Sequence, residues 1–565
     1  MSANAELQHR LLVGIDVGGT FTDAVVVRGR EVLATAKALT EPAHLERSLL
    51  GALDGVLGEI EPAEVARVSL STTLITNLIA QGRVPEVALL LIPGPGRNPA
   101  DYRLPARVWT VGGAVDFRGR VTAPLDRAEV DEVLEEIQGE GLEYLGVVGK
   151  FSPRNPTHEQ QVAAWAAERD GWQVKAGHGV AGQLNFPRRA AATALTLAVE
   201  RPYRAFFAEL RAALQARGLD CPLVVLKADG GTLPLEVAEH EPLHSIFSGP
   251  AASTMGALAL RPPGATSVVV DVGGTTTDLA LVLDGEPVYA SKGAELEGYP
   301  LPVRAFAVRS LPVGGDGTLA LEEGQPVLLA TRAGVAASLG GPAPTLTDAL
   351  RLLGHSDVGD PARAREALAT LGEPEAVART VVDQALARIH AGIEAMFESW
   401  RREPVYRLWQ LRRKTERRPD VVVGLGAAGG ALVPLLGARM EAEVIVPPYA
   451  PVANALGAAV ARTTYTTTLR VDTEQRILEV LEAGRTEPLP AGRYTLEDVR
   501  ELARSWMARR GEALGIEAPL VDAVEVLAEQ FNVVEGWRTV GRIFDVRWER
   551  PAGLVQAWRE ERNAE

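Results

Sequence analysis

The sequence predicts an α/β protein in which two similar domains face each other, followed by a small α+β region. Three observations predict this fold. A D-V-G-G-T pattern, closed by T-D two residues later, occurs at residues 16–23 and again at 271–278. The copies begin 255 residues apart, which is too far for a solenoid repeat and fits two domains of similar size. Helical and strand patterns alternate over residues 100–225, as they do in α/β folds.

Each copy of the pattern is predicted to form a hairpin. Apolar runs precede Asp16 and Asp271, and further apolar runs follow Asp23 and Asp278. This pattern predicts two strands joined by a tight turn in each copy. Glycine can take backbone angles that are closed to other residues, so consecutive amides at such a turn can point toward one oxyanion and bind it. One copy alone could be an ordinary turn, but two copies favour a shared phosphate site. The residues expected to contact phosphates are Gly18, Gly19, Thr20, Gly273, Gly274, Thr275 and Thr276.

The first Asp of each copy is the expected catalytic and metal-binding residue. A carboxylate at the end of a buried strand is costly unless it holds a cation or orients a reacting group. We therefore expect Asp16 and Asp271 to hold Mg²⁺ beside the phosphates. Asp23 and Asp278 are expected to brace the hairpins by accepting hydrogen bonds from turn amides.

Two hairpins that grip one phosphate chain from both sides resemble the arrangement in actin, sugar kinases and heat-shock-chaperone ATPases. The resemblance implies two actin-like (ribonuclease H-like) ATPase domains that face a nucleotide cleft, with ATP and Mg²⁺ as cofactors. The expected domains are residues 1–225 with the first hairpin, 226–462 with the second, and an α+β region at 463–565.

Bulk composition excludes several classes of protein. With 565 residues, of which 46% are hydrophobic, the chain can bury several cores. A net charge of −15 argues against nucleic acid as a partner, and the Arg-rich stretch near residues 407–418 is short. No window approaches the roughly 20 apolar residues of a membrane span, and the first ten residues lack the apolar core of a signal peptide. We therefore expect a cytoplasmic protein with no membrane partner.

A disulfide framework and three kinds of metal site are also excluded. Cys221 is the only cysteine, so a disulfide framework, a zinc cluster of cysteines and a cysteine-ligated iron–sulfur cluster cannot form within this chain. Residues 240–244 match the zinc-protease string H-E-x-x-H, but Pro242 interrupts the helix that this site requires.

A glycine-rich turn follows the apolar run at residues 421–423 and precedes an apolar helix. The turn contains Gly424, Gly426, Gly429 and Gly430, and a helix N-terminus there could bind the adenosine or the α-phosphate of a nucleotide. A tight strand-to-helix turn with no ligand is the alternative. Two small-residue helices, starting at residues 249 and 454, are predicted to pack closely against each other between the domains.

Further motifs accompany the hairpins in a fixed order. They are S-T-T-L-I-T-N-L-I-A-Q-G at 71–82, N-P-T-H-E at 155–159, K-A-D-G-G-T-L at 227–233, S-G-P-A-A at 248–252 and V-P-P-Y-A-P-V-A-N-A-L-G at 446–457. Together they resemble the hydantoinase A and 5-oxoprolinase family over roughly residues 11–462. The resemblance implies ATP-dependent opening of a cyclic amide such as a hydantoin or 5-oxoproline, with a hydantoinase B-type subunit as a possible partner and a homo- or hetero-oligomer as the assembly. Related chains are ATP-using subunits of acetone and acetophenone carboxylases.

Polar residues within two of these motifs are the expected substrate contacts. They are Thr72, Thr73, Thr76, Asn77, Asp229, Gly230 and Gly231. The threonines could equally cap a helix, and the Asp could close an Asx turn.

The chain also departs from the family pattern. Leu432 stands where members carry a histidine, the glycine-rich run after the second hairpin is V-G-G-D-G-T-L at 313–319, and the C-terminal region is short. Three functions therefore stay open: a cyclic amidase, an ATP-using subunit of a carboxylase, and a non-catalytic nucleotide-binding relative.

Overall fold

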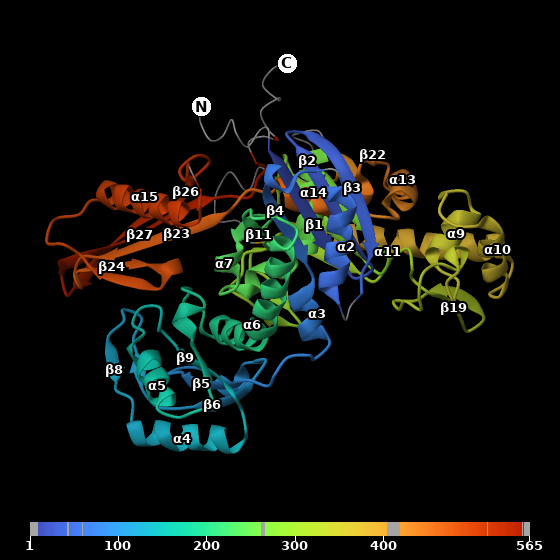
Figure 1. Cartoon of the computed structure of the whole chain (residues 1–565). Coiled ribbons are helices and arrows are strands. Elements are labelled where there is room, and N and C mark those ends of the chain that lie inside the picture. Colours follow the sequence, from blue (N-terminus) through green and yellow to red (C-terminus); the bar gives the residue numbers. More distant parts are fainter. Residues whose placement is uncertain are drawn as a thin grey trace.

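The structure is a computed structural model that describes residues 10–41, 44–58, 60–260, 266–403, 418–516, 518–555 and 558. The Arg-rich stretch near 407–418 lies outside these ranges except for its last residue. Two sheets and the helices between them form the centre of the molecule, with a parallel-sheet region, a helical region and a C-terminal region around it (Figure 1). Within the described ranges, no helix combines the length and the apolar character needed to cross a membrane.

The first central sheet carries the first hairpin. Its strand order is β12 (Thr232–Pro234), β11 (Leu223–Leu226), β4 (Val65–Thr72), β1 (Leu11–Val17), β2 (Phe21–Arg28) and β3 (Glu31–Leu39). β1, β4 and β11 are parallel, whereas β2 and β3 are antiparallel to their neighbours. β1 is buried along its whole length, as expected for an apolar run covered on both faces. The sheet continues past residue 225, where the sequence suggested a domain boundary, because β11 and β12 pair within it.

The second central sheet repeats this pattern around the second hairpin. Its order is β15 (Glu286–Pro287), β14 (Thr277–Leu283), β13 (Ser267–Val272), β21 (Val421–Leu425) and β22 (Glu443–Ile445), and β18 (Val308–Leu311) also pairs with β14. β13 is antiparallel to β14 and parallel to β21, as β1 is to β2 and β4. The registers match too, since Asp16 is paired with Asp23 and Asp271 with Asp278. The expected fold of two similar halves is confirmed.

Two helices of small residues lie between the sheets. They are α8 (Ser248–Leu260) and α14 (Ala453–Val460), and they confirm the expected close pair. A Cβ atom at Gly457 would overlap the carbonyl of Ala252, and one at Gly256 would overlap the carbonyl of Ala453. The absence of side chains at both positions therefore lets the two backbones touch.

Replacing Gly14 by Ala is expected to destabilise the protein. Gly14 lies in β1, and a Cβ atom there would overlap the carbonyl of Ala455 in α14. Overpacking a rigid core typically costs about 1–3 kcal/mol. Urea unfolding should show this loss for Gly14→Ala. Gly139→Ala is the control, because a Cβ atom there meets nothing within 4 Å; equal stability of both variants would contradict the expectation.

Three helices cover one face of the first sheet, and the longest of them also contacts the parallel-sheet region. α2 (Leu45–Leu57), α3 (Leu74–Ala80) and α6 (Phe186–Gln215) contribute to the core of the first sheet. α6 also packs on the parallel-sheet region, whose strand order is β10 (Gln173–Ala176), β9 (Tyr144–Gly149), β5 (Ala88–Ile92) and β6 (Arg107–Thr110). The other face of this parallel sheet is covered by α4 (Arg127–Gly139) and α5 (Thr157–Ala167). α5 and β9 confirm the alternation of helix and strand that is expected over residues 100–225.

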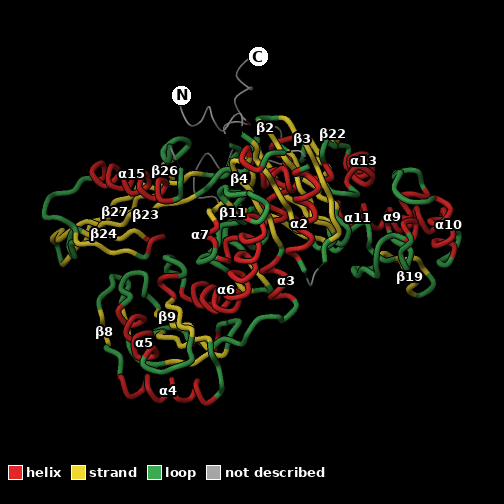
Figure 2. Tube along the Cα trace, in the orientation of Figure 1, coloured by secondary structure: helices red, strands yellow, loops and turns green. Residues whose placement is uncertain are grey.

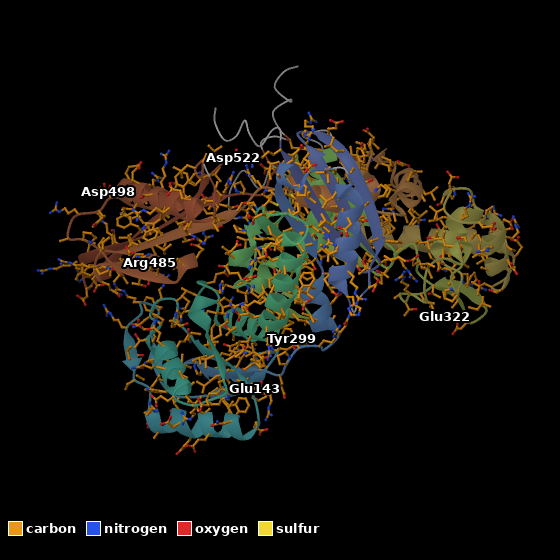
Figure 3. All side chains as sticks on the ribbon, viewed as in Figure 1. Glu143, Tyr299, Glu322, Arg485, Asp498 and Asp522 are labelled. Carbon is orange, nitrogen blue, oxygen red and sulfur yellow. The ribbon has the colours of Figure 1, made fainter. Side chains whose placement is uncertain are left out.

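A helical region lies beside the second sheet (Figure 2). It consists of α9 (Leu346–Leu352), α10 (Pro361–Ala369) and α11 (Pro374–Arg402), which pack with α13 (Gly429–Met440) into one core. α11 and α13 contact the strands of the sheet, whereas α9 and α10 pack on α11. The hairpin of β19 (Leu319–Glu322) and β20 (Gln325–Leu328) projects from this end of the molecule, with Glu322 at its tip (Figure 3).

The C-terminal region is an antiparallel sheet covered by one helix, as the α+β expectation requires. The order is β25 (Arg485–Pro488), β24 (Ile477–Val480), β23 (Tyr465–Asp472), β27 (Arg538–Arg550) and β26 (Val524–Glu535), with α15 (Leu496–Ala513) across it. The remaining elements are short: β7 (Ala114–Val115), β8 (Val121–Ala123), α7 (Leu235–Ala238), β16 (Glu295–Leu296) and β17 (Tyr299–Pro300).

Candidate functional site

Asp16 and Asp271 share a hydrogen-bond donor at the centre of the molecule. The side-chain amide of Asn454 donates to Asp16 Oδ2 over 3.4 Å and to Asp271 Oδ2 over 3.1 Å. Asn454 lies in α14, the small-residue helix between the two sheets. One amide thus brings together the two carboxylates that the sequence places 255 residues apart.

Both carboxyl groups are buried, at 6% and 7% exposure, and both resist ionisation. Burial raises the pKa of Asp16 and of Asp271 to about 7, and nearby carboxylates add to this shift, whereas the hydrogen bond from Asn454 opposes it. Burial likewise raises the pKa of Asp278 to about 6. A bound cation would offset the cost of ionising this cluster.

The metal-free protein is expected to lose stability as the pH rises. Folding raises the pKa of Asp16 and Asp271 from 3.8 to about 7, so the folded state binds more protons than the unfolded state between these values. The free energy of unfolding should therefore fall between pH 4 and pH 7, by roughly 4 kcal/mol per carboxyl at most. Urea unfolding with a chelator measures this slope. The slope should be shallower in Asp16→Asn, and an equal slope in this variant would contradict the assignment.

The hairpin turns leave several amides available to a ligand. Gly18 N–H donates to Phe21 O over 3.1 Å, and Gly273 N–H donates to Thr276 O over 2.9 Å. Among the described residues, no hydrogen-bond acceptor meets the amides that follow, and exposed N–H groups of this kind suit phosphate oxygens. These amides belong to Gly19, Thr20, Gly274 and Thr275.

The expected reason for the turn glycines was wrong in part. None of Gly18, Gly19, Gly273 and Gly274 has a positive φ, so the turns do not require the left-handed region. Close approach is the reason at Gly274, where a Cβ atom would lie 3.0 Å from Thr20 Oγ1 of the other hairpin and 2.8 Å from Asp316 Oδ2. At Gly274 the second hairpin therefore comes close to the first.

The second Asp of each hairpin binds partners other than turn amides. Asp23 Oδ1 lies 2.5 Å from the Lys37 ammonium on the neighbouring strand β3. Asp278 is hydrogen-bonded to Ser310, which is paired with it in β18. The expectation that these carboxylates bond turn amides was wrong, because adjacent strands supply a cation and a hydroxyl at the right register.

The glycine-rich turn after β21 touches the second Asp. Gly426 has a φ of +80°, and a Cβ atom there would overlap Asp271 Oδ1. Gly426 N–H donates to Ala450 O, and Ala428 N–H donates to Val272 O, so the turn is fixed against both the hairpin and the segment before α14. Gly424 packs against Val433, Gly429 and Gly430 begin α13, and Leu432 is wholly buried. Contact of this turn with a nucleotide stays a prediction.

The expected threonines lie beside the first hairpin. Thr72 is paired with Val17, and Thr73 Oγ1 donates to Val17 O over 3.3 Å. Ser248, the first residue of α8, accepts from Thr72 N–H at 3.0 Å and donates to Thr72 O at 2.9 Å. The remaining two, Thr76 and Asn77, hydrogen-bond to Thr73 within α3. The group therefore sits next to Asp16, with its polar side chains engaged locally.

Asp229 lies at the carboxyl end of β11, on the same sheet edge, but its carboxylate is satisfied by its neighbours. It accepts from Lys227 Nζ at 2.9 Å, from Gly231 N–H at 3.0 Å and from the Thr464 hydroxyl. Burial would raise the pKa of Asp229, but Lys227 holds it below its usual value. Gly230 has a φ of +78° and packs against Phe306. The bond from Gly231 N–H to Asp229 makes this motif an Asx turn. Contact of Asp229, Gly230 and Gly231 with a substrate stays a prediction.

The donor set fits Mg²⁺. Among the described residues, the buried oxygen Asp16 Oδ1 has no hydrogen-bond partner, so one carboxylate oxygen is left for a cation. Mg²⁺ is commonly held by one or two carboxylates together with water and phosphate oxygens. Among the described residues there is no cluster of three or more His, Cys, Asp or Glu side chains that could hold a metal without such help.

The H-E-x-x-H string is no metal site. α7 ends at Ala238 and a short 3₁₀ turn follows at Pro242–Ser245, so the two histidines lie on no common helix. His240 instead pairs with Arg204, and His244 with Glu241.

Sequence reasoning missed Asn454, Ser248 and Asp316 as site residues. The available signal was weak: Asn454 is the only polar side chain in an otherwise small and apolar helix, and Asp316 interrupts a glycine-rich run.

Known proteins are similar to this chain in sequence and in fold. Caprolactamase subunit alpha of Pseudomonas jessenii is 25% identical over 535 residues, which cover 87% of this chain and 76% of that protein. The structure of ATP-dependent acetone carboxylase matches with a TM-score of 0.66 at 19% identity, over 98% of this chain and 83% of that one. The structure of ATP-dependent caprolactamase from Pseudomonas jessenii matches with a TM-score of 0.65 at 20% identity, over 95% and 87%.

Two family assignments cover most of the sequence. Residues 12–169 match the hydantoinase/oxoprolinase N-terminal region, and residues 189–467 match the hydantoinase/oxoprolinase domain. These ranges contain both hairpins, the glycine-rich turn and Asn454, and they confirm the resemblance drawn from the motifs. The chain belongs to the hydantoinase/oxoprolinase family.

Proposed function

We propose that this protein opens a cyclic amide by ATP-dependent hydrolysis, as the A-type subunit of a complex with a second chain. The observation that carries the proposal is the meeting of the two hairpins, where Asn454 bonds both Asp16 and Asp271. The sequence similarity to caprolactamase subunit alpha supports both the cyclic amide as substrate and a partner subunit.

The chemistry explains why a lactamase needs a nucleotide. A lactam carbonyl is a poor electrophile, so transfer of the γ-phosphoryl group to the amide oxygen activates the carbonyl carbon. This step forms an oxygen–phosphorus bond and breaks the bond from the γ-phosphorus to the leaving ADP oxygen. One water then adds to the carbon, the ring nitrogen takes a proton as the carbon–nitrogen bond breaks, and a second water releases phosphate. The products are an amino acid, ADP and phosphate.

The residues of the site have distinct roles in this reaction. The free amides of the two hairpins bind β- and γ-phosphate oxygens and hold the phosphorus in line with the amide oxygen. Asp16 and Asp271 would hold Mg²⁺, which when bound neutralises charge on the phosphates. Asn454 keeps both carboxylates in position. The turn at Gly426 supports the rest of the nucleotide, and Thr72 and Thr73 border the space for the lactam.

A carboxylase subunit is the second candidate, because the fold also matches that of acetone carboxylase. The two candidates differ in the second substrate. A carboxylase would consume ATP only with a ketone and bicarbonate, whereas an amidase would respond to a cyclic amide alone.

Phosphate release from Mg-ATP is the test of both. The chain is purified under mild conditions, so that a bound partner is retained, and is assayed with caprolactam, 5-oxoproline, hydantoins, and simple ketones with bicarbonate. Stimulation by one cyclic amide, with ring-opened product detected by mass spectrometry, supports the proposal. Stimulation only by a ketone with bicarbonate would replace it by the carboxylase. Tight ATP binding without turnover on any substrate, with the partner present, would favour a non-catalytic relative.

A further inference from the structure

A loop that follows β18 lies directly on the second hairpin. Gly315 N–H donates to Gly273 O over 2.9 Å, and Asp316 N–H donates to Gly274 O over 2.7 Å. A Cβ atom at Gly314 would come within 2.5 Å of the carbonyl carbon of Gly274, so the two backbones touch. The backbone of this loop therefore lies against the second hairpin.

Asp316 is the only charged residue of this loop, and its carboxylate borders both hairpins. A Cβ atom built on Gly274 would lie 2.8 Å from Asp316 Oδ2 and 3.0 Å from Thr20 Oγ1. The same small region is thus shared by the first hairpin, the second hairpin and the carboxylate. The Asp316 side chain is only 13% exposed.

Arg332 reaches the same carboxylate oxygen from another loop. Its Nε lies 3.1 Å from Asp316 Oδ2, and its side chain is 28% exposed. In the part of the chain that the structure describes, Asp316 is its one ionic partner. Neighbouring backbone bonds fix the segment, since Thr318 N–H donates to Thr331 O and Ala333 N–H donates to Thr318 Oγ1. The backbone that carries Arg332 is therefore anchored next to the phosphate site.

An ion pair of this kind adds little to stability. Partly exposed pairs contribute little, because solvent screens the two charges and forming the pair orders two flexible side chains. A guanidinium, however, presents paired N–H donors that match a phosphate group, and a cation beside a transferring phosphoryl group stabilises its charge. The position beside both hairpins is where such a cation would act.

We propose that Arg332 binds the terminal phosphate of the nucleotide, and that Asp316 holds the guanidinium beside the hairpins until the nucleotide arrives. The inference rests on the proposed function, since it assigns a ligand to the same nucleotide site. Because only a nucleoside triphosphate carries a γ-phosphate, Arg332 would make the site bind a triphosphate more tightly than a diphosphate.

The test compares a non-hydrolysable ATP analogue with ADP, both with Mg²⁺, by isothermal titration calorimetry. Arg332→Ala is expected to weaken binding of the analogue about 10- to 100-fold, the range for one lost hydrogen bond to a charged group, and to leave ADP binding unchanged. The affinity of Arg332→Lys for the analogue should lie between that of Arg332→Ala and that of the unaltered chain, because lysine keeps the charge but lacks the paired donors. Arg363→Ala is the matched control, since Arg363 is exposed on α10 and pairs with Asp360 at 3.9 Å.

Asp316→Asn tests the holding role separately. The guanidinium then loses the carboxylate that holds it, so the analogue should bind more weakly than it does to the unaltered chain but more tightly than it does to Arg332→Ala. Unchanged affinity for the analogue would overturn this role. Unchanged affinity of Arg332→Ala for the analogue, or an equal loss for analogue and ADP, would overturn the inference and leave the proposed function intact. If the unaltered chain binds neither nucleotide, the proposed function and the inference both fail.

Discussion

Asp16→Asn is expected to reduce substrate-dependent phosphate release roughly 100- to 1000-fold, the scale of losing one preorganised electrostatic group at a reacting centre. The replacement keeps the size of the side chain and an oxygen that can accept from Asn454, but it removes the charge that would hold Mg²⁺. The same replacement is expected to stabilise the folded protein. Because burial raises the pKa of Asp16 to about 7, the neutral variant should be more stable than the unaltered protein at pH 8 in the absence of metal.

The measurement is steady-state phosphate release at saturating Mg-ATP, with thermal unfolding of the same preparations. Asp383→Asn is the control, because Asp383 is 71% exposed on α11 and pairs with Arg439 away from the hairpins. Asp271→Asn should behave like Asp16→Asn, since the two carboxylates share Asn454. Unchanged turnover in either site variant would remove that carboxylate from the mechanism.

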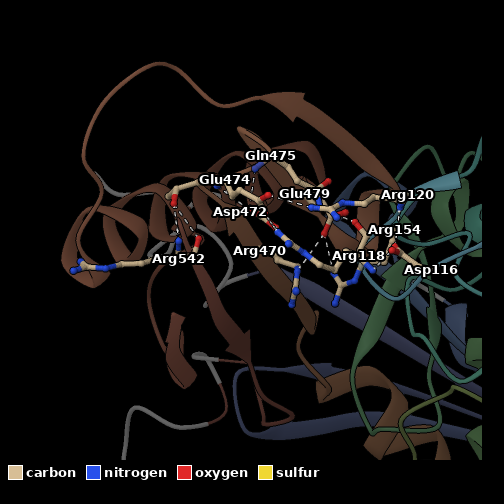
Figure 4. A network of polar contacts seen from close by, with 11 residues as sticks. Asp116, Arg118, Arg120, Arg154, Arg470, Asp472, Glu474, Gln475, Glu479 and Arg542 are labelled. Atoms are coloured by element: carbon tan, nitrogen blue, oxygen red, sulfur yellow. Dashed lines mark hydrogen bonds and ion pairs between the residues drawn. The ribbon is translucent and has the colours of Figure 1, made fainter. Parts of the chain in front are cut away.

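The second large effect is a loss of stability, expected when a buried ion pair between the parallel-sheet region and the C-terminal region is broken. Arg118 and Arg154 come from the parallel-sheet region and point toward Asp472, Glu474 and Glu479 (Figure 4). Arg154 Nη1 lies 2.8 Å from Glu479 Oε2, and the two side chains are 10% and 4% exposed. Burial raises the pKa of Glu479 and lowers that of Arg154, so each group depends on the other to stay charged.

Arg154→Met should therefore destabilise the contact by about 3 kcal/mol, at the low end of the range for a broken buried pair. The loss is limited because Arg470 Nε remains 3.7 Å from the same oxygen of Glu479. The double variant Arg154→Met/Glu479→Leu should recover much of the stability, since apolar side chains can replace a buried pair without leaving a charge.

Urea unfolding of the three variants, with hydrogen exchange of β24 and α5, measures this effect. Arg97→Ala is the control, because Arg97 forms an exposed pair with Asp101 in the same region. A loss in Arg154→Met no greater than in this control would show that the network contributes little to holding the two regions together.

The strands, the hairpins and the helix pair could be predicted because their signals are local. β1 and β13 are apolar runs closed by glycine turns, and the period of their side chains identifies them as strands without any knowledge of the partner. α8 and α14 are rich in small residues, which indicates close packing wherever they lie. The place of β11 could not be predicted in this way, because it pairs with β4 across more than 150 residues of chain, and β12 then pairs with β11.

The site shows the same division. Asp16 and Asp271 were recognisable because their motif repeats, whereas the role of Asn454 depends on a helix that contacts both sheets at once. The pair of Asp316 and Arg332 arises from two loops that meet only in the folded chain. Asp23 and Asp278 were misassigned for a related reason, since their partners Lys37 and Ser310 are supplied by the register of neighbouring strands.

The sequence by itself determined the two glycine hairpins, the family and the strands and helices that carry the candidate site, because turn geometry and apolar periodicity act over a few residues. Only the tertiary structure decided which distant groups share the site and how each is charged. Two carboxylates 255 residues apart come within reach of one amide because α14 touches both sheets, and their raised pKa values follow from burial that the folded chain alone creates.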